Sequence, residues 1–209
     1  TEQGYNSAGS ISSMIPPLLR DWSEFDHLRF DESHPWWERF VNQLRVMSEA
    51  ARGKFGVAHF TVIDSLNFVY ELLGATDTYL SLYERPDMVR RAIDFAFDLN
   101  VKIHRTFFDL VPDLDGGSCG FVLPWIPGHV LCESVDPFHM TSVEDFEKWG
   151  FEPIRRIFGE FDGGGVEIDT EDVVVGDEHF HLLEFLDVFV VGDDDAGFLK
   201  DLFERAEIV

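Results

Sequence analysis

Apolar residues along the chain alternate between helical spacing and short continuous runs, which predicts helices and strands in turn. Helical spacing, bounded in places by Pro or Gly, predicts helices over residues 35–52, 64–73, 86–110, 142–158 and 196–206. Short apolar runs predict strands over residues 55–63, 120–123, 129–133, 166–168, 173–175 and 188–191. Residues 1–30 are polar and turn-rich and are predicted to form an irregular arm. Strands that alternate with long helices are typical of an α/β domain with a parallel sheet.

Polar residues follow the predicted strands directly, at the edge where parallel sheets carry their chemistry. Asp64, Ser65 and Asn67 come after one strand, and Glu133 and Ser134 come after another. We predict Asp64 as the catalytic residue and the other four as substrate contacts. Each of these residues is also suited to cap the helix that follows, and the sequence leaves that alternative open.

The amino-acid composition excludes several classes of protein and of binding partner. The chain has 209 residues and two cysteines, which fits one domain and excludes a disulfide scaffold. Its net charge of −24 argues against nucleic acid and anionic membranes as partners, because both attract basic proteins. The sequence shows no signal-peptide pattern and no apolar run long enough to cross a bilayer, so we expect a soluble, cytoplasmic protein.

The acidic residues concentrate at the end of the chain. Residues 160–209 contain 16 Asp or Glu against Lys200 and Arg205, a net charge of −14. Adaptation to high salt and a calcium-binding loop at residues 193–195 are alternatives, but an EF-hand pattern is absent there. We interpret residues 166–209 as an acidic, divergent part of the same domain.

Several segments, taken in order, carry a family resemblance. They are HFTVID at 59–64, ELLG at 71–74, YERPDMV at 83–89, CES at 132–134, MTSVEDFEKW at 140–149 and PIRRI at 153–157. Their order and spacing within residues 55–160 resemble the uroporphyrinogen decarboxylase superfamily. The resemblance implies a (β/α)8 barrel, here incomplete or shortened, because a full barrel takes about 250 residues. In that family Ser134 would match a substrate-contacting residue, and Ser65 stands where the decarboxylases have an active-site Tyr.

The resemblance implies either of two activities. The first is cofactor-free decarboxylation of a porphyrinogen-type or related carboxylated substrate. The second is a zinc-dependent methyl transfer between corrinoids and thiols, which in the family uses a His-x-Cys pair after a strand. Here that position carries Glu167 and Asp169, so we expect no metal. If a metal is bound, its ligands would be Glu167 and Asp169 with Cys119 or Cys132.

Two further residues are predicted substrate contacts. Trp125 lies between prolines in a loop at a strand end, where a ring can face a ligand, and His129 begins the next predicted strand. An anionic substrate would also need arginines, for which Arg105, Arg155 and Arg156 are candidates. A third hypothesis is a catalytically silent barrel module, whose open sheet edges would pair with a second copy. We expect a small-molecule substrate and a homodimer.

Overall fold

The computed structural model describes residues 4–5, 13–14, 16–120, 124–167 and 188–191. Its helices are η1 (Trp22–His27), α1 (Pro35–Ala51), α2 (Ser65–Leu73), α3 (Ala75–Glu84), α4 (Pro86–Leu110), η2 (Asp136–Met140), α5 (Val143–Phe146), η3 (Glu147–Phe151) and α6 (Glu152–Phe158). Its strands are β1 (Gly4–Tyr5), β2 (Ser13–Met14), β3 (Ala58–His59), β4 (Gly117–Gly120), β5 (Ile126–Pro127), β6 (Leu131–Ser134), β7 (Gly164–Glu167) and β8 (Val188–Val191). The mixed α/β class is as predicted.

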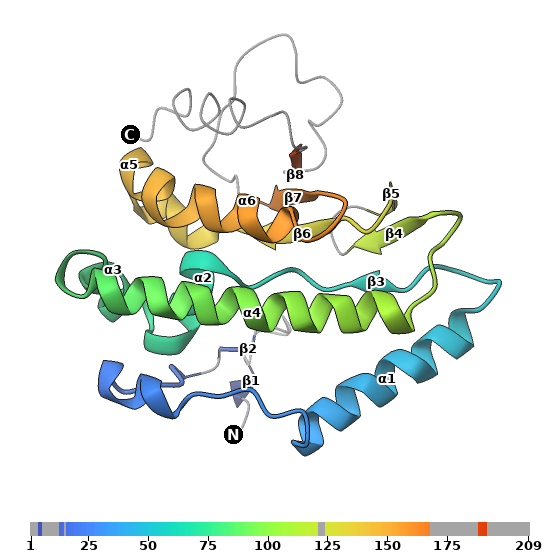
Figure 1. Cartoon of the computed structure of the whole chain (residues 1–209), viewed down its shortest axis with the longest axis horizontal. Coiled ribbons are helices and arrows are strands. Elements are labelled where there is room, and N and C mark those ends of the chain that lie inside the picture. The colour runs from blue at the N-terminus through green and yellow to red at the C-terminus, as the bar shows by residue number, and fades with distance from the viewer. Residues whose placement is uncertain (1–3, 6–12, 15, 121–123, 168–187, 192–209) are drawn as a thin grey trace, which may run out of the picture.

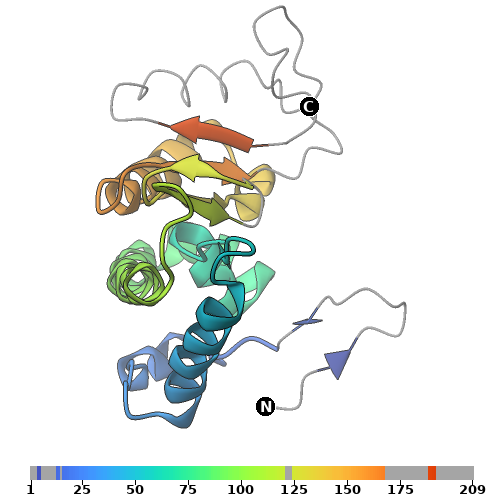
Figure 2. The same cartoon turned by 90° about the vertical axis from the view of Figure 1, so that its right-hand side faces the viewer.

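The strands and helices form successive layers. Figure 1 shows the long α4 running below the strands and roughly alongside α6. Figure 2 shows the same order from the side, with β8 at one end, α2 and α4 in the middle, and α1 and η1 at the other end.

The strand β3 joins the two halves of the sheet. It pairs in parallel with β4 on one side, and Val62 just beyond it forms a parallel bridge to Glu133 of β6. The strand β6 in turn pairs in parallel with β7. The chain therefore makes two consecutive strand–helix–strand units, one through α2–α4 and one through α5–α6, as in a (β/α) barrel.

Two pairings depart from a barrel. The strand β5 is antiparallel to β4, and β8 is antiparallel to β7, so the expectation of an all-parallel sheet is wrong at both places. An antiparallel neighbour needs no helical crossover, whereas every neighbour in a (β/α)8 barrel does. The described residues show a small sheet without barrel closure, so the (β/α)8 barrel stays a prediction.

Most predicted elements occur, with corrections. The predicted strand over 55–63 is reduced to β3 and the bridge at Val62, and the helix over 142–158 is interrupted by the π-helical turn η3. The predicted arm contains η1, whose Trp22 and Phe25 are buried in the core. The helix α3 was not predicted.

Some predicted elements lie partly or wholly outside the described residues. Those over 173–175 and 196–206 lie outside the described residues, as do 121–123 of the strand predicted over 120–123.

The main core lies between the sheet and helices α2, α4 and α6. Its fully buried members include Leu66 and Val69 of α2, Val89 of α4, and Ile154 and Ile157 of α6. A smaller cluster joins α1 to the end of α4 and consists of Leu44, Ala51, Val57, Phe107 and Val111. Among the described residues, no helix is both long and apolar enough to span a membrane.

Candidate active site

Asp64 and Glu133 lie at neighbouring strand ends because β3 and β6 run parallel. The backbone N–H of Val62 donates to the carbonyl of Cys132 at 2.7 Å, which fixes the register between the segment after β3 and β6. Two residues beyond Val62 the chain reaches Asp64, while Glu133 stands directly opposite Val62. The two carboxyl groups are thereby brought together at the carboxyl edge of the sheet, as the sequence predicted for this edge.

The turn from β3 into α2 is strained at Ser65. Asp64 has extended backbone and is the N-cap of α2, although its side chain makes no capping hydrogen bond. Ser65 has a φ of +48°, a conformation that costs a residue with a Cβ about 1–2 kcal/mol. Strained residues of this kind cluster at functional sites.

Both carboxyl groups are fully buried. Asp64 and Glu133 have no solvent-exposed surface, and the Ser65 hydroxyl donates to Oε1 of Glu133 at 3.2 Å. Both oxygens of Asp64 and Oε2 of Glu133 have no hydrogen-bond partner among the described residues. A buried carboxylate without donors is very costly, so these groups must hold a proton or a ligand.

The electrostatics favour the protonated forms of both carboxyl groups. Burial raises the pKa of Asp64 to about 7, against smaller lowering effects of the nearby Ser65 N–H and of Arg156. Burial, and then the charge of Asp64, raise the pKa of Glu133 well above its usual range, while the Ser65 hydroxyl lowers it. Both shifts favour the protonated carboxyl groups, which gives the pair the chemistry of a proton donor.

Asn67 and Ser134 join the two strand ends rather than facing an open cavity. The Asn67 amide donates to the carbonyl of Ser134, and the Ser134 hydroxyl donates to Asp136 at 2.7 Å. Both side chains thus hold α2 against the turn that follows β6. Their predicted contact with substrate stays a prediction.

Two residues on α4 complete the surroundings of the pair, and the sequence analysis missed both. The Asn100 amide donates to the carbonyl of Ile63 at 2.7 Å and fixes the chain just before Asp64. The charge of Asp94 raises the pKa of Asp64, opposite to the effect of Arg156. A buried Asn within a mainly apolar helical stripe is the signal that points to the role of Asn100.

Trp125 and His129 lie away from the carboxyl pair. Trp125 precedes β5 and donates its Nε1–H to the carbonyl of Leu114 at 2.7 Å. His129 precedes β6, pairs with Asp113 at 2.8 Å and stacks on Phe108 with ring centroids 4.3 Å apart. The Trp125 ring packs back against Leu114 and Gly117 at the start of β4, and His129 lies before β6, so neither side chain is at the edge that carries Asp64 and Glu133.

The residues named for a possible metal are also dispersed. Cys119 lies on β4 and Cys132 on β6, Glu167 ends β7, and Asp169 lies outside the described residues. Within the described part of the chain, no group of three or more His, Cys, Asp or Glu side chains is arranged to hold a metal ion. The expectation that no cofactor is needed stays a prediction.

A second buried titratable group lies on α4, beside β3. His104 of α4 is fully buried, with Nδ1 hydrogen-bonded to the carbonyl of Asn100 at 2.9 Å. Its ring packs against His59 and Phe60, at centroid distances of 6.0 and 4.9 Å. Burial lowers the pKa of His104 to about 4, so the ring is neutral at physiological pH.

In comparisons with known proteins, no protein-family model, curated protein or solved structure matches the chain.

Proposed function

We propose that this chain is a cofactor-free decarboxylase in which the Asp64–Glu133 pair transfers the proton. The supporting observation is the burial of two carboxyl groups side by side at the carboxyl edge of a parallel sheet. Decarboxylation replaces a carboxylate with a proton, so it requires an acid that is still protonated at neutral pH. The raised pKa values of Asp64 and Glu133 meet that requirement.

The roles of the two carboxyl groups follow from their chemistry. The protonated member of the pair gives its proton to the substrate carbon, and its ionised partner stabilises the cation formed. Carbon dioxide then leaves, and the electrons of the broken C–C bond form an exocyclic C=C bond that neutralises the cation. The carbon that lost carbon dioxide takes up a proton from solvent, and the first protonated carbon returns its proton to the pair. Ser65 is a positioning residue, since its hydroxyl holds Glu133. The substrate class is that implied by the resemblance, a porphyrinogen or a related polycarboxylate.

The site must open before it can act. Asp64 and Glu133 are fully buried, so substrate reaches them only after the surrounding side chains move apart. When substrate fills the space between these side chains, water is again excluded from the carboxyl pair, and both pKa values stay raised.

The test is carbon dioxide release from uroporphyrinogen under anaerobic conditions, with the full chain and its variants. The Asp64→Asn and Glu133→Gln variants keep the shape of each side chain but cannot transfer a proton. We expect each to lower kcat by about 100-fold or more, the usual contribution of a positioned acid. Asp77→Asn is the matched control, because Asp77 is an exposed carboxylate in the first turn of α3. Circular dichroism of each variant establishes that it folds.

Two results would overturn the proposal. One is the absence of carbon dioxide release by the wild-type chain. The other is about one divalent metal ion per purified chain that is lost in Asp64→Asn, which would make the carboxyl pair a metal centre. The latter would favour the metal-dependent alternative of the same superfamily.

A second candidate function is self-assembly. Phe60 and Ile63, on either side of the bridge residue Val62, are each 39% exposed although they belong to the chain that joins the two halves of the sheet. A second copy that covers these two side chains would give the expected homodimer through an apolar face. Analytical ultracentrifugation of the full chain tests this function, and Phe60→Ser should shift a dimer towards monomer. A wild-type chain that sediments as a monomer at all concentrations excludes it.

A further inference from the structure

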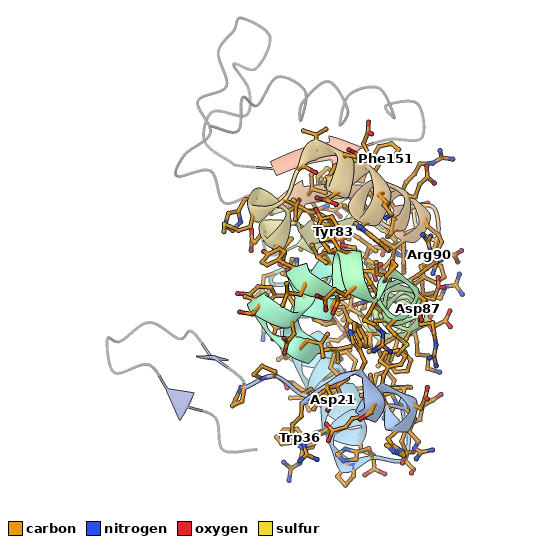
Figure 3. The ribbon with its side chains drawn as sticks, turned by 90° about the vertical axis from the view of Figure 1, so that its left-hand side faces the viewer. Asp21, Trp36, Tyr83, Asp87, Arg90 and Phe151 are labelled. Atoms are coloured by element: carbon orange, nitrogen blue, oxygen red, sulfur yellow. The ribbon has the colours of Figure 1, made fainter. Side chains whose placement is uncertain are left out.

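A groove on the outer face of the molecule, between α4 and the helices of residues 143–158, gathers basic side chains. It has a volume of about 460 Å³ and is bordered by the charged residues Arg90, Asp94, Lys148, Glu152, Arg155, Arg156 and Glu160. Four of these are basic, in a chain that has 16 Lys and Arg against 40 Asp and Glu. Figure 3 shows Arg90 at the side of the molecule where α4 lies beneath those helices. The groove is therefore a local exception to the acidic character of the chain.

Two of the cations are held over the same aromatic ring. The guanidinium of Arg90 lies 5.4 Å from the centroid of Trp149, and the ammonium of Lys148 lies 4.5 Å from it. Trp149 itself is buried, so the ring is a fixed platform. Cation–π attraction holds each charge at this ring, and among the described residues neither cation forms an ion pair.

The backbone that carries this platform is unusual. Lys148 and Trp149 belong to η3, a π-helical turn between α5 and α6. Such turns are rare and occur frequently at functional sites. Gly150 makes the turn possible, because a Cβ at that position would stand 2.7 Å from the ring of Phe146. The helix thus departs from regular geometry at the residues that present the cation and the ring.

The remaining charges of the groove divide into paired and unpaired groups. Arg156 pairs with Asp94 at 2.7 Å, and Glu160 pairs with Arg105 at 2.5 Å. Among the described residues, Arg90, Lys148 and Arg155 form no ion pair, and Glu152 is the unpaired acid beside them. The groove therefore has an excess of positive charge after its internal pairs are formed.

We propose that this groove binds a small oxyanion, the phosphate or carboxylate group of a metabolite, between Arg90 and Lys148. Both cations border the groove, so an oxyanion in it accepts charge-assisted hydrogen bonds from them. Arg155 lies on the same groove and supplies a further positive charge. The site is separate from the carboxyl pair, and the inference does not rest on the proposed decarboxylation.

The test uses the full chain and isothermal titration calorimetry, with pyrophosphate and citrate as separate probes and sodium chloride at matched ionic strength as reference. We expect saturable binding of at least one probe with a stoichiometry of one per chain. Pyrophosphate binding alone identifies phosphate as the ligand group, and citrate binding alone identifies carboxylate. Binding of neither probe beyond the chloride reference overturns the proposal.

Variants locate the binding in the groove. Arg90→Gln and Lys148→Gln should each weaken binding about tenfold, because each removes one charge-assisted hydrogen bond. Arg39→Gln is the matched control: Arg39 also lies over a Trp ring, at 4.9 Å from the centroid of Trp36, but on α1. This control should bind as the wild type does. Unchanged affinity in both groove variants, or an equal loss in the control, overturns the assignment.

Tryptophan fluorescence provides a second readout. An anion placed between the two cations changes the charge next to the Trp149 ring, so the emission should change in proportion to binding. Trp149→Phe should abolish this change. If emission changes equally in Trp149→Phe, the anion binds elsewhere.

Discussion

Replacing Asp64 by Asn should change the pH dependence of the free energy of unfolding. Asn has the same shape as Asp but cannot ionise, so the variant lacks one of the two buried carboxyl groups. The pKa of Asp64 is raised from 3.8 to about 7 by burial. Between these values the folded chain binds a proton that the unfolded chain has released.

The sign and the magnitude follow from this difference. Because the folded state binds more protons, the wild-type free energy of unfolding falls as pH rises, by about 1.4 kcal/mol per pH unit. The contribution of Asp64 is fully present below about pH 4, is lost through about pH 7 and totals about 4 kcal/mol. The stability of Asp64→Asn relative to wild type should therefore rise by about 4 kcal/mol over this interval and then level off.

Urea denaturation of both proteins at a series of pH values measures this difference. The effects of groups that do not interact with Asp64 cancel, whereas the pKa of Glu133 also falls in the variant because the charge of Asp64 is gone. Asp77→Asn, at an exposed carboxylate, should keep a nearly constant difference from wild type. If the difference between Asp64→Asn and wild type does not change with pH, Asp64 is ionised in the folded protein and the interpretation of the pair is wrong.

Two further predictions concern other parts of the core. His104 has its pKa lowered to about 4, so the wild type should lose about 3 kcal/mol as pH falls from about 6.5 to about 4. His104→Gln should remove that loss in the same urea series. If its free energy of unfolding falls with pH as steeply as that of the wild type, the prediction is wrong. Gly164→Ala places a Cβ 2.2 Å from the Phe158 ring and should destabilise by about 1–3 kcal/mol. Gly159→Ala, whose Cβ has room and whose backbone is already helical, should be neutral or slightly stabilising, and equal effects of the two in thermal unfolding would refute the packing argument.

Much of the site was predictable because it depends on order along the chain. The helix α4 occurs over the predicted residues, since Pro86 fits a first turn and the apolar stripe continues for its whole length. The meeting of Asp64 and Glu133 follows from parallel strands whose ends share one edge. Neither inference required knowledge of side-chain contacts.

The rest depends on contacts that sequence patterns do not encode. The apolar residues after His129 do not reveal that β6 begins at Leu131, so the predicted strand began two residues too early, at His129. Gly74 was interpreted as the end of a helix, but its φ of +79° also allows the chain to turn directly into α3. The antiparallel addition of β8 depends on pairing with β7, which no local pattern specifies.

The π-helical turn η3 has a consequence for comparing this chain with other sequences. One additional residue in a turn rotates every later side chain by about 100° relative to a regular helix. Ile154 and Ile157 follow this turn and are fully buried in the core. A protein with the same core but an unbroken helix would therefore align with this chain only across a one-residue gap near Gly150. Such a gap, in an otherwise continuous helix, would distinguish chains that have the groove from chains that lack it.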